Sequence, residues 1–275
     1  MTSIRVLGVH GVGNRQSIMD APLAARKIAH WWNAALDRQL NLAGRLTLEV
    51  VYYADRLAQP TPQGDGSDID ALDQEIQLAI RVWAMQLGAR NEISHGRFTI
   101  PARVSVDWVA RTFGLNQRLT RRFVSTFFPE VHRYMTDQVA RAAVRTEIAM
   151  ALERIRPDIL IAHSLGSVAA YESLWMQTHP DIDLLLTLGS PLAMPDIIYE
   201  RLTPDTGQRG RPPGVTRWIN IADPGDLIAI PRGGIGTSFT NVAADITDVI
   251  HAFDFHRVTN YLTCGATTGI ISSYL

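Results

Sequence analysis

Short runs of apolar residues alternate along the chain with longer stretches in which apolar residues recur at helical spacing. The short runs predict strands over Ile4–Val9, Leu46–Tyr53, Asp158–Ala162, Leu184–Leu188, Val215–Ile221 and Phe239–Ala243. The longer stretches predict helices over Ala21–Leu40, Val131–Ile155 and Gly166–Gln177, and a last helix from about Thr259. This alternation is typical of a mostly parallel sheet with helices on both faces. We therefore expect an α/β fold whose sheet has about six strands.

Residues 56–130 interrupt this alternation. The segment opens with QPTPQGDGSD, in which closely spaced prolines and glycines cannot continue a helix or a central strand. Two amphipathic stretches follow, at Ile69–Leu87 and Arg103–Phe128, and no set of strands accompanies them. An insertion of this kind is most simply a helical cap or lid. We therefore predict one domain over residues 1–275, with 56–130 as a cap insertion.

The composition is that of an ordinary globular protein, because 46% of the residues are hydrophobic, 19% are charged and the net charge is −1. A charge so close to zero gives no electrostatic reason to expect nucleic acid as a partner. Cys264 is the single cysteine, so an intrachain disulfide is impossible and secretion gains no support. The N-terminus enters a strand-like run at once, without the charged and apolar regions of a signal peptide. We therefore expect a cytoplasmic location.

The candidate chemistry begins in PDILIAHSLGSVAAYESL, residues 157–174. An apolar run ends at Ala162 and a helical pattern begins after Ser164, which places a serine on the turn between a strand and a helix. In a nucleophile elbow, written G-x-S-x-G, such a strained turn lifts the serine hydroxyl clear of the sheet. Here Ala162 replaces the first glycine and Gly166 retains the second. The alternative interpretation is that Ser164 only caps the helix.

Candidate partners for Ser164 follow in the chain order serine, acid, histidine that this architecture uses. The predicted strand VTRWINIA leads to two acidic residues, Asp223 and Asp226, and either is placed to orient an imidazole. Asp223 is also suited to brace the turn through its own side chain. His256 lies just before the predicted last helix, and His251 is the alternative base five residues earlier.

The first predicted strand leads into HGVGN, residues 10–14, where glycines expose backbone N–H groups at the carboxyl edge of the sheet. Ligands of open α/β sheets bind at this edge. The amides of this loop and the amide of Leu165 are therefore candidate donors for an oxyanion hole. The sequence has neither a phosphate-binding loop with its lysine nor an HExxH motif or a Cys/His cluster, so it predicts no nucleotide and no metal.

Five segments of the chain resemble α/β-hydrolases of the serine esterase and lipase type: HGVGN, IAHSLGS, TLGSPL, WINIADPGDLIA and FHRVTNYL. The resemblance covers roughly residues 3–55 and 130–275. It implies that Ser164 attacks the substrate, that His256 is the base and that an aspartate orients it. In the family pattern this acid directly precedes a hydrophobic run that ends near a proline, which favours Asp226, before LIAIP.

The resemblance further implies that the amides of Val12 and Leu165 bind the oxyanion. This chain departs from the family pattern in Ala162 and in lacking the strands that usually precede the oxyanion strand. The sheet is therefore expected to be smaller than in typical members. The cap insertion resembles no family.

Together these features predict a serine hydrolase that cleaves a carboxylic ester through an acyl-enzyme on Ser164 and needs no cofactor. The substrate would be a small-molecule or lipid ester. One alternative is an acyltransferase or thioesterase that uses the same three residues. A second alternative is a non-catalytic protein of this fold that binds a ligand or a partner.

Candidate substrate-binding residues are His163, beside the nucleophile, and Trp108 and Phe113 in the cap. The segment between residues 101 and 135 contains six arginines and two acidic residues, which gives a net charge of +4, and phenylalanines are interleaved with them. Such a segment is suited to weak contact with an anionic membrane surface. The favoured interpretation is a helix whose phenylalanines pack on the sheet while its arginines stay solvated. The apolar face of the cap is expected to line an acyl pocket.

Overall fold

The computed structural model describes residues 3–42, 44–58, 68–89, 100–176, 179–205, 209–250 and 256–275. The chain divides into two compact units. The sheet unit consists of Met1–Arg56 and Arg141–Leu275, and the helical unit consists of Leu57–Ala140. The helical unit contains the predicted cap insertion and continues beyond its predicted end.

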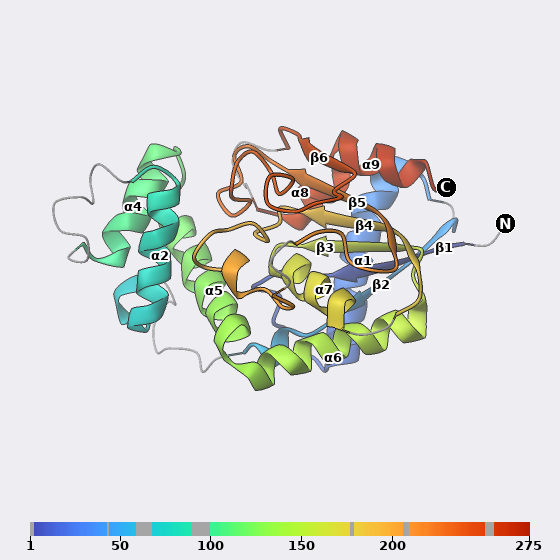
Figure 1. The fold of residues 1–275 in the computed structure, drawn as a ribbon, viewed down its shortest axis with the longest axis horizontal. Coiled ribbons are helices and arrows are strands. Elements are labelled where there is room, and N and C mark those ends of the chain that lie inside the picture. Colours follow the sequence, from blue (N-terminus) through green and yellow to red (C-terminus); the bar gives the residue numbers. More distant parts are fainter. Residues whose placement is uncertain are drawn as a thin grey trace. The chain divides into compact units, whose positions relative to one another are not determined.

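The sheet unit is built on six parallel strands in the order β2-β1-β3-β4-β5-β6 (Figure 1). The strands are β1 (Ile4–Val9), β2 (Leu46–Val51), β3 (Ile159–His163), β4 (Ile182–Leu188), β5 (Val215–Ala222) and β6 (Ala244–Thr247). This arrangement confirms the predicted α/β class and is consistent with the α/β-hydrolase fold. Parallel pairing places the carboxyl ends of the strands at one edge of the sheet, where the candidate residues are expected.

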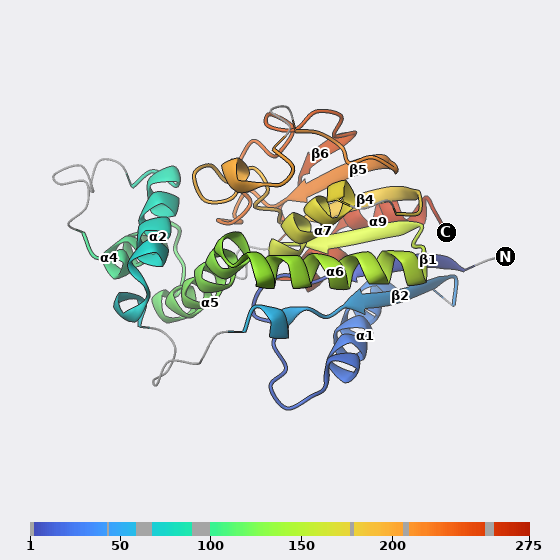
Figure 2. The same ribbon diagram turned by 60° about the horizontal axis from the view of Figure 1, so that its bottom comes forward.

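Helices cover both faces of this sheet. On one face lie α1 (Ala21–Leu40), α8 (Val258–Thr263) and α9 (Gly265–Ser272), which share a buried core cluster with inward residues of β1, β3 and β4. On the other face lie α6 (Gln138–Ile155) and α7 (Leu165–Met176), as Figure 2 shows. The described residues also form three single turns of 3₁₀ helix: η1 (Ala54–Arg56), η2 (Ile69–Ala71) and η3 (Tyr199–Arg201).

The predicted sixth strand was placed wrongly, because β6 begins only after Ala243. Phe239 instead packs its ring against Tyr171 and Trp218, at centroid distances of 5.4 and 5.3 Å. Its hydrophobicity therefore serves an aromatic cluster and not a strand. In β6 itself the exposed fractions alternate along the strand, as expected at the outer edge of a sheet.

Two predicted helices are each divided. The one predicted over Val131–Ile155 is interrupted at Asp137, whose carboxylate accepts hydrogen bonds from the amides of Val139 and Ala140, at 3.0 Å each. This side chain caps the start of α6. The last predicted helix forms α8 and α9, which are separated at Cys264.

The helical unit contains α2 (Gln74–Gln86), α4 (Ala102–Thr112) and α5 (Gln117–Thr136). The stretch predicted as Arg103–Phe128 turns at Gly114, whose φ of 66° favours glycine. Trp83 is fully buried and meets Phe128 edge-on at 5.5 Å, and Phe127 packs on Phe128. These rings form a core within the helical unit. Among the described residues, no helix is long and apolar enough to span a bilayer.

Candidate active site

The register of the sheet brings several strand ends to one level. His163 pairs with Leu188, and Leu188 pairs with Ile221, so β3, β4 and β5 end side by side. The residues that follow these strands, including Ser164 and Asp223, therefore emerge at a common edge.

Ser164 occupies the sharp turn between β3 and α7. Its φ of 55° lies in the left-handed region, which residues other than glycine rarely adopt, and its side chain is buried. The amide of Ser164 donates to the carbonyl of Leu188 at 3.1 Å. A Cβ at Gly166 would overlap the carbonyl oxygens of Val9 and His10, so only glycine lets α7 approach β1 so closely. The local geometry is that of a nucleophile elbow.

Two further serines hold this turn. The amide and the hydroxyl of Ser167 both donate to the carbonyl of Ser164, at 2.9 and 2.6 Å. The Ser190 hydroxyl lies 2.7 Å from that of Ser167. The strained residue is thus stabilised by bonds to its own backbone, which leaves the Ser164 hydroxyl available for a different partner.

That partner is His256. Its Nε2 lies 2.7 Å from the Ser164 Oγ, and its Nδ1 lies 2.7 Å from Oδ2 of Asp226. A carboxylate accepts only, so Nδ1 carries the proton, and Nε2 accepts a hydrogen bond from the Ser164 hydroxyl. The three side chains are buried, with exposed fractions of 0% for Ser164, 1% for Asp226 and 9% for His256.

The two candidate acids have different contacts. Asp226 faces His256, and its other oxygen accepts from the amide of Ile228 at 2.9 Å. Asp223 instead accepts from the amides of Gly225, at 2.7 Å, and Ile250, at 2.8 Å. Asp223 therefore braces its own turn and the segment that leads towards His256. The alternative base, His251, lies outside the described residues.

Two other histidines flank the site and are held neutral. Burial lowers the pKa of His10 to about 4. Its Nε2 accepts from the amide of Tyr53 at 3.3 Å, so its Nδ1 donates to the carbonyl of Gly11 at 2.8 Å. Burial, and then the neighbouring His256, hold the pKa of His163 well below 6.5. The ring centroids of His163 and His256 are 4.8 Å apart, and Nε2 of His163 has no hydrogen-bond partner among the described residues.

The predicted oxyanion donors belong to two different segments of the chain. Leu165 is the first residue of α7, and Val12 lies in the loop that follows β1. Within the described part of the chain, neither amide donates to another group. The side chain of Asn14 donates to the carbonyls of Gly11, at 3.0 Å, and Val12, at 3.1 Å, and so fixes the loop. A helix N-terminus adds a favourable dipole for developing negative charge.

The sequence did not predict the contacts of two residues beside Asp226. The hydroxyl of Tyr261 donates to Oδ2 of Asp226 at 2.7 Å. Gly189 has a φ of 52°, and a Cβ there would lie 2.7 Å from the same oxygen. The segments TLGSPL and FHRVTNYL contain both residues, but a contact between distant segments leaves no periodic signal in the sequence.

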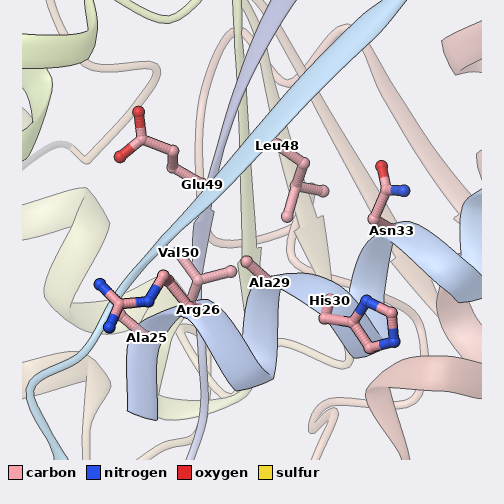
Figure 3. A pocket seen from close by; sticks show the side chains of 8 residues that line it. All are labelled: Ala25, Arg26, Ala29, His30, Asn33, Leu48, Glu49 and Val50. Atoms are coloured by element: carbon pink, nitrogen blue, oxygen red, sulfur yellow. The ribbon is translucent and has the colours of Figure 1, made fainter. Parts of the chain in front are cut away.

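A separate hollow of about 320 Å³ lies between α1 and the edge strand β2 (Figure 3). It is lined by Ala25, Arg26, Ala29, His30, Asn33, Leu48, Glu49 and Val50. None of these residues belongs to the group around Ser164, and the set contains no hydroxyl or thiol nucleophile. The candidate active site is therefore the cluster at the carboxyl edge and not this hollow.

The two other predicted substrate contacts, Trp108 and Phe113, lie in the helical unit, on α4 and at its C-cap, and both are half-buried. Their role in binding stays a prediction. Among the described residues, no group of three or more His, Cys, Asp or Glu side chains is arranged to hold a metal ion.

Comparisons of the chain with protein-family models, with curated proteins and with solved structures found no match.

Proposed function

We propose that the protein is a serine hydrolase that cleaves a carboxylic ester through an acyl-enzyme on Ser164. The observation that carries this proposal is the continuous chain of hydrogen bonds from Ser164 through His256 to Asp226, with both distances at 2.7 Å. The strained backbone of Ser164 supports it, because such strain is retained where the surrounding structure enforces it, often at active sites.

In the first step, the Ser164 Oγ attacks the ester carbonyl carbon while Nε2 of His256 accepts its proton. The Asp226 carboxylate holds the useful tautomer and stabilises the imidazolium that forms. Negative charge develops on the former carbonyl oxygen, towards which the amides of Val12 and Leu165 would donate. Because His10 and His163 stay neutral, His256 accepts the proton without a competing positive charge beside it.

The tetrahedral intermediate then collapses. The alcohol leaves with the proton from Nε2 of His256, and the acyl group remains on Ser164. His256 next deprotonates a water molecule that attacks the acyl-enzyme, and the carboxylic acid leaves as Ser164 recovers its proton. Apart from the ester and water, every group in this cycle is a side chain or a backbone amide of the chain itself, so the proposed reaction needs no cofactor.

We further propose that the helical unit governs the choice of substrate. The half-buried rings of Trp108, on α4, and Phe113, at its C-cap, support this proposal. The arginines of the helical unit give limited support to membrane contact. Arg121 forms a bidentate pair with Asp107, at 2.7 and 2.6 Å, and Arg103 lies 3.2 Å from Asp70.

The proposed function is tested by labelling the whole chain with a fluorophosphonate, which reacts with activated serines. Labelling should occur on Ser164 and be lost in Ser164→Ala, while Ser273→Ala, at an exposed serine near the C-terminus, should label normally. Full labelling of Ser164→Ala would overturn the assignment. Unlabelled wild-type protein would then be assayed against esters and thioesters of graded acyl length, with and without alcohol acceptors. Transfer of the acyl group to the alcohol in place of water would identify an acyltransferase. A folded wild type that does not label would point to the non-catalytic alternative.

A further inference from the structure

We propose that Tyr261 is a positioning residue for the reaction. Its hydroxyl holds the Asp226 carboxylate in place and limits how strongly that carboxylate attracts the proton of His256. This inference rests on the proposed function, since it assigns a role within the same site.

The direction of each hydrogen bond follows from the donors. The amide of Asp223 can only donate, and it reaches the Tyr261 hydroxyl oxygen at 3.0 Å. The hydroxyl proton is therefore left for Oδ2 of Asp226, at 2.7 Å. Tyr261 thus links the end of β5 to the acid, from its place on α8.

Two donors share one carboxylate oxygen. Oδ2 of Asp226 accepts from Tyr261 and from Nδ1 of His256, at 2.7 Å each, while Oδ1 accepts from the amide of Ile228. Each donor opposes rotation of the carboxylate. The hydroxyl also draws electron density from the oxygen that His256 uses, because a hydrogen bond to a charged acceptor is strong.

Tyr261 is suited to act as a permanent donor. It is 1% exposed, and burial together with the Asp226 charge raises the pKa of its phenol, so the hydroxyl stays protonated. The surroundings also leave space for this contact. A Cβ at Gly189 would lie 2.7 Å from Oδ2 of Asp226 and 3.0 Å from the Tyr261 ring.

Removal of the hydroxyl changes two measurable quantities. Among the described residues, Oδ2 of Asp226 then keeps His256 as its one side-chain donor. The imidazolium is therefore stabilised, and the reaction loses its base at a higher pH. The carboxylate also gains freedom to rotate, so the rate on the plateau falls. Among the described residues, the titratable groups in contact with His256 include Asp226 and His163, and His163 stays neutral. Tyr261 contacts Asp226 and the amide of Asp223.

The test is the rate of fluorophosphonate labelling from pH 5 to 9 for the wild type, Tyr261→Phe and Tyr199→Phe. The Tyr199 hydroxyl donates to the carbonyl of Ser238 at 3.1 Å, so Tyr199→Phe is a matched loss of a bonded phenol elsewhere. We expect Tyr261→Phe to label about tenfold more slowly on the plateau. The midpoint of its acid limb should lie about half a pH unit or more above that of the wild type. Tyr199→Phe should follow the wild type.

A second variant keeps the shape of the ring. Incorporation of 3,5-difluorotyrosine at position 261 gives a stronger donor and should move the midpoint to lower pH, a shift opposite to that of Tyr261→Phe. If both midpoints equal that of the wild type, Tyr261 has only a structural role and the inference is wrong, even if rates or melting temperatures fall. If the wild type does not label at any pH, the proposed function fails and this inference fails with it.

Discussion

The Oγ of Ser164 and the Nε2 of His256 lie 2.7 Å apart, although 92 positions separate the two residues in the chain. Ser164 is placed by the turn after β3, and His256 by the start of α8. Asp226, on the loop after β5, bonds the far side of the imidazole. Residues from three segments that are distant in the sequence therefore converge on a single imidazole ring.

The first prediction separates the two neighbouring acids. Asp226→Asn should lower kcat/KM by at least about a thousandfold, because the amide no longer enforces the tautomer in which Nε2 accepts a proton. Asp223→Asn keeps an oxygen for one of the amides of Gly225 and Ile250 and should cost far less. Both are measured on protein shown to be folded by circular dichroism. A larger loss in Asp223→Asn would reverse the assignment.

The second prediction concerns stability and pH. Because burial lowers the pKa of His10 to about 4, the unfolded chain binds a proton between about pH 6.5 and 4 that the folded chain does not. The free energy of unfolding should therefore fall as the pH falls through this window, and His10 accounts for at most about 3 kcal/mol of that loss. Above pH 6.5 the contribution of His10 to stability is complete. His163 acts in the same direction.

Urea unfolding at pH 7.5 and 5 measures this loss. His10→Gln should show a smaller difference between the two pH values than the wild type, whatever its absolute stability. His30→Gln, at an exposed position of α1, serves as the control and should keep the full difference. An unchanged difference in His10→Gln would contradict the attribution to this buried imidazole.

The third prediction concerns Gly189. Gly189→Ala places a methyl group against Oδ2 of Asp226 in a residue with a φ of 52°, so it should cost about 2 kcal/mol or more of stability and slow labelling of Ser164. Gly269→Ala is the matched control, since a Cβ there meets no atom within 4 Å and the residue lies inside α9. It should be neutral or stabilising by up to about 1 kcal/mol. Equal melting temperatures for the two variants would disprove this account.

Much of the fold could be predicted because apolar periodicity records burial directly. The bounds of β1 and α1 agree with the pattern residue for residue, since β1 is a short apolar run with its last four residues buried and α1 buries residues at helical spacing. The sixth strand was predicted at Phe239 because an apolar pattern does not distinguish a ring buried in an aromatic cluster from a ring in a strand. The break at Asp137 had a signal, a capping aspartate before a helical pattern, which the continuous periodicity outweighed.

The candidate site was predictable to the extent that chain order and strand ends define it. The sequence placed Ser164, Asp226 and His256 at loops that a parallel sheet brings to one edge. The contact between Tyr261 and Asp226 was not predictable, because it joins a helix to a loop through a single hydroxyl. A tyrosine on the apolar side of a helix is normally interpreted as a core residue, and Tyr261 is indeed buried in the core cluster.

The last prediction concerns the helical unit. If its half-buried apolar residues line an acyl pocket, Trp108→Ala and Phe113→Ala should shift the preferred acyl length in the graded ester panel while the melting temperature changes little. Trp83→Ala is the contrasting variant. It removes a fully buried ring that packs on Phe128, so it should cost about 3 kcal/mol or more of stability.

The opposing outcome is binding to a membrane surface. In that case Arg118, Arg121 and Arg122 would act together, and binding to anionic vesicles would weaken with added salt. Arg121 already pairs with Asp107, so a surface effect should rest chiefly on the exposed Arg118 and Arg122. The measurement is vesicle sedimentation of the wild type and of the triple variant with all three arginines changed to glutamine. Vesicle binding that is lost in the triple variant, with turnover of soluble short esters unchanged, would show that this unit docks on membranes. That result would contradict the prediction that the unit lines an acyl pocket.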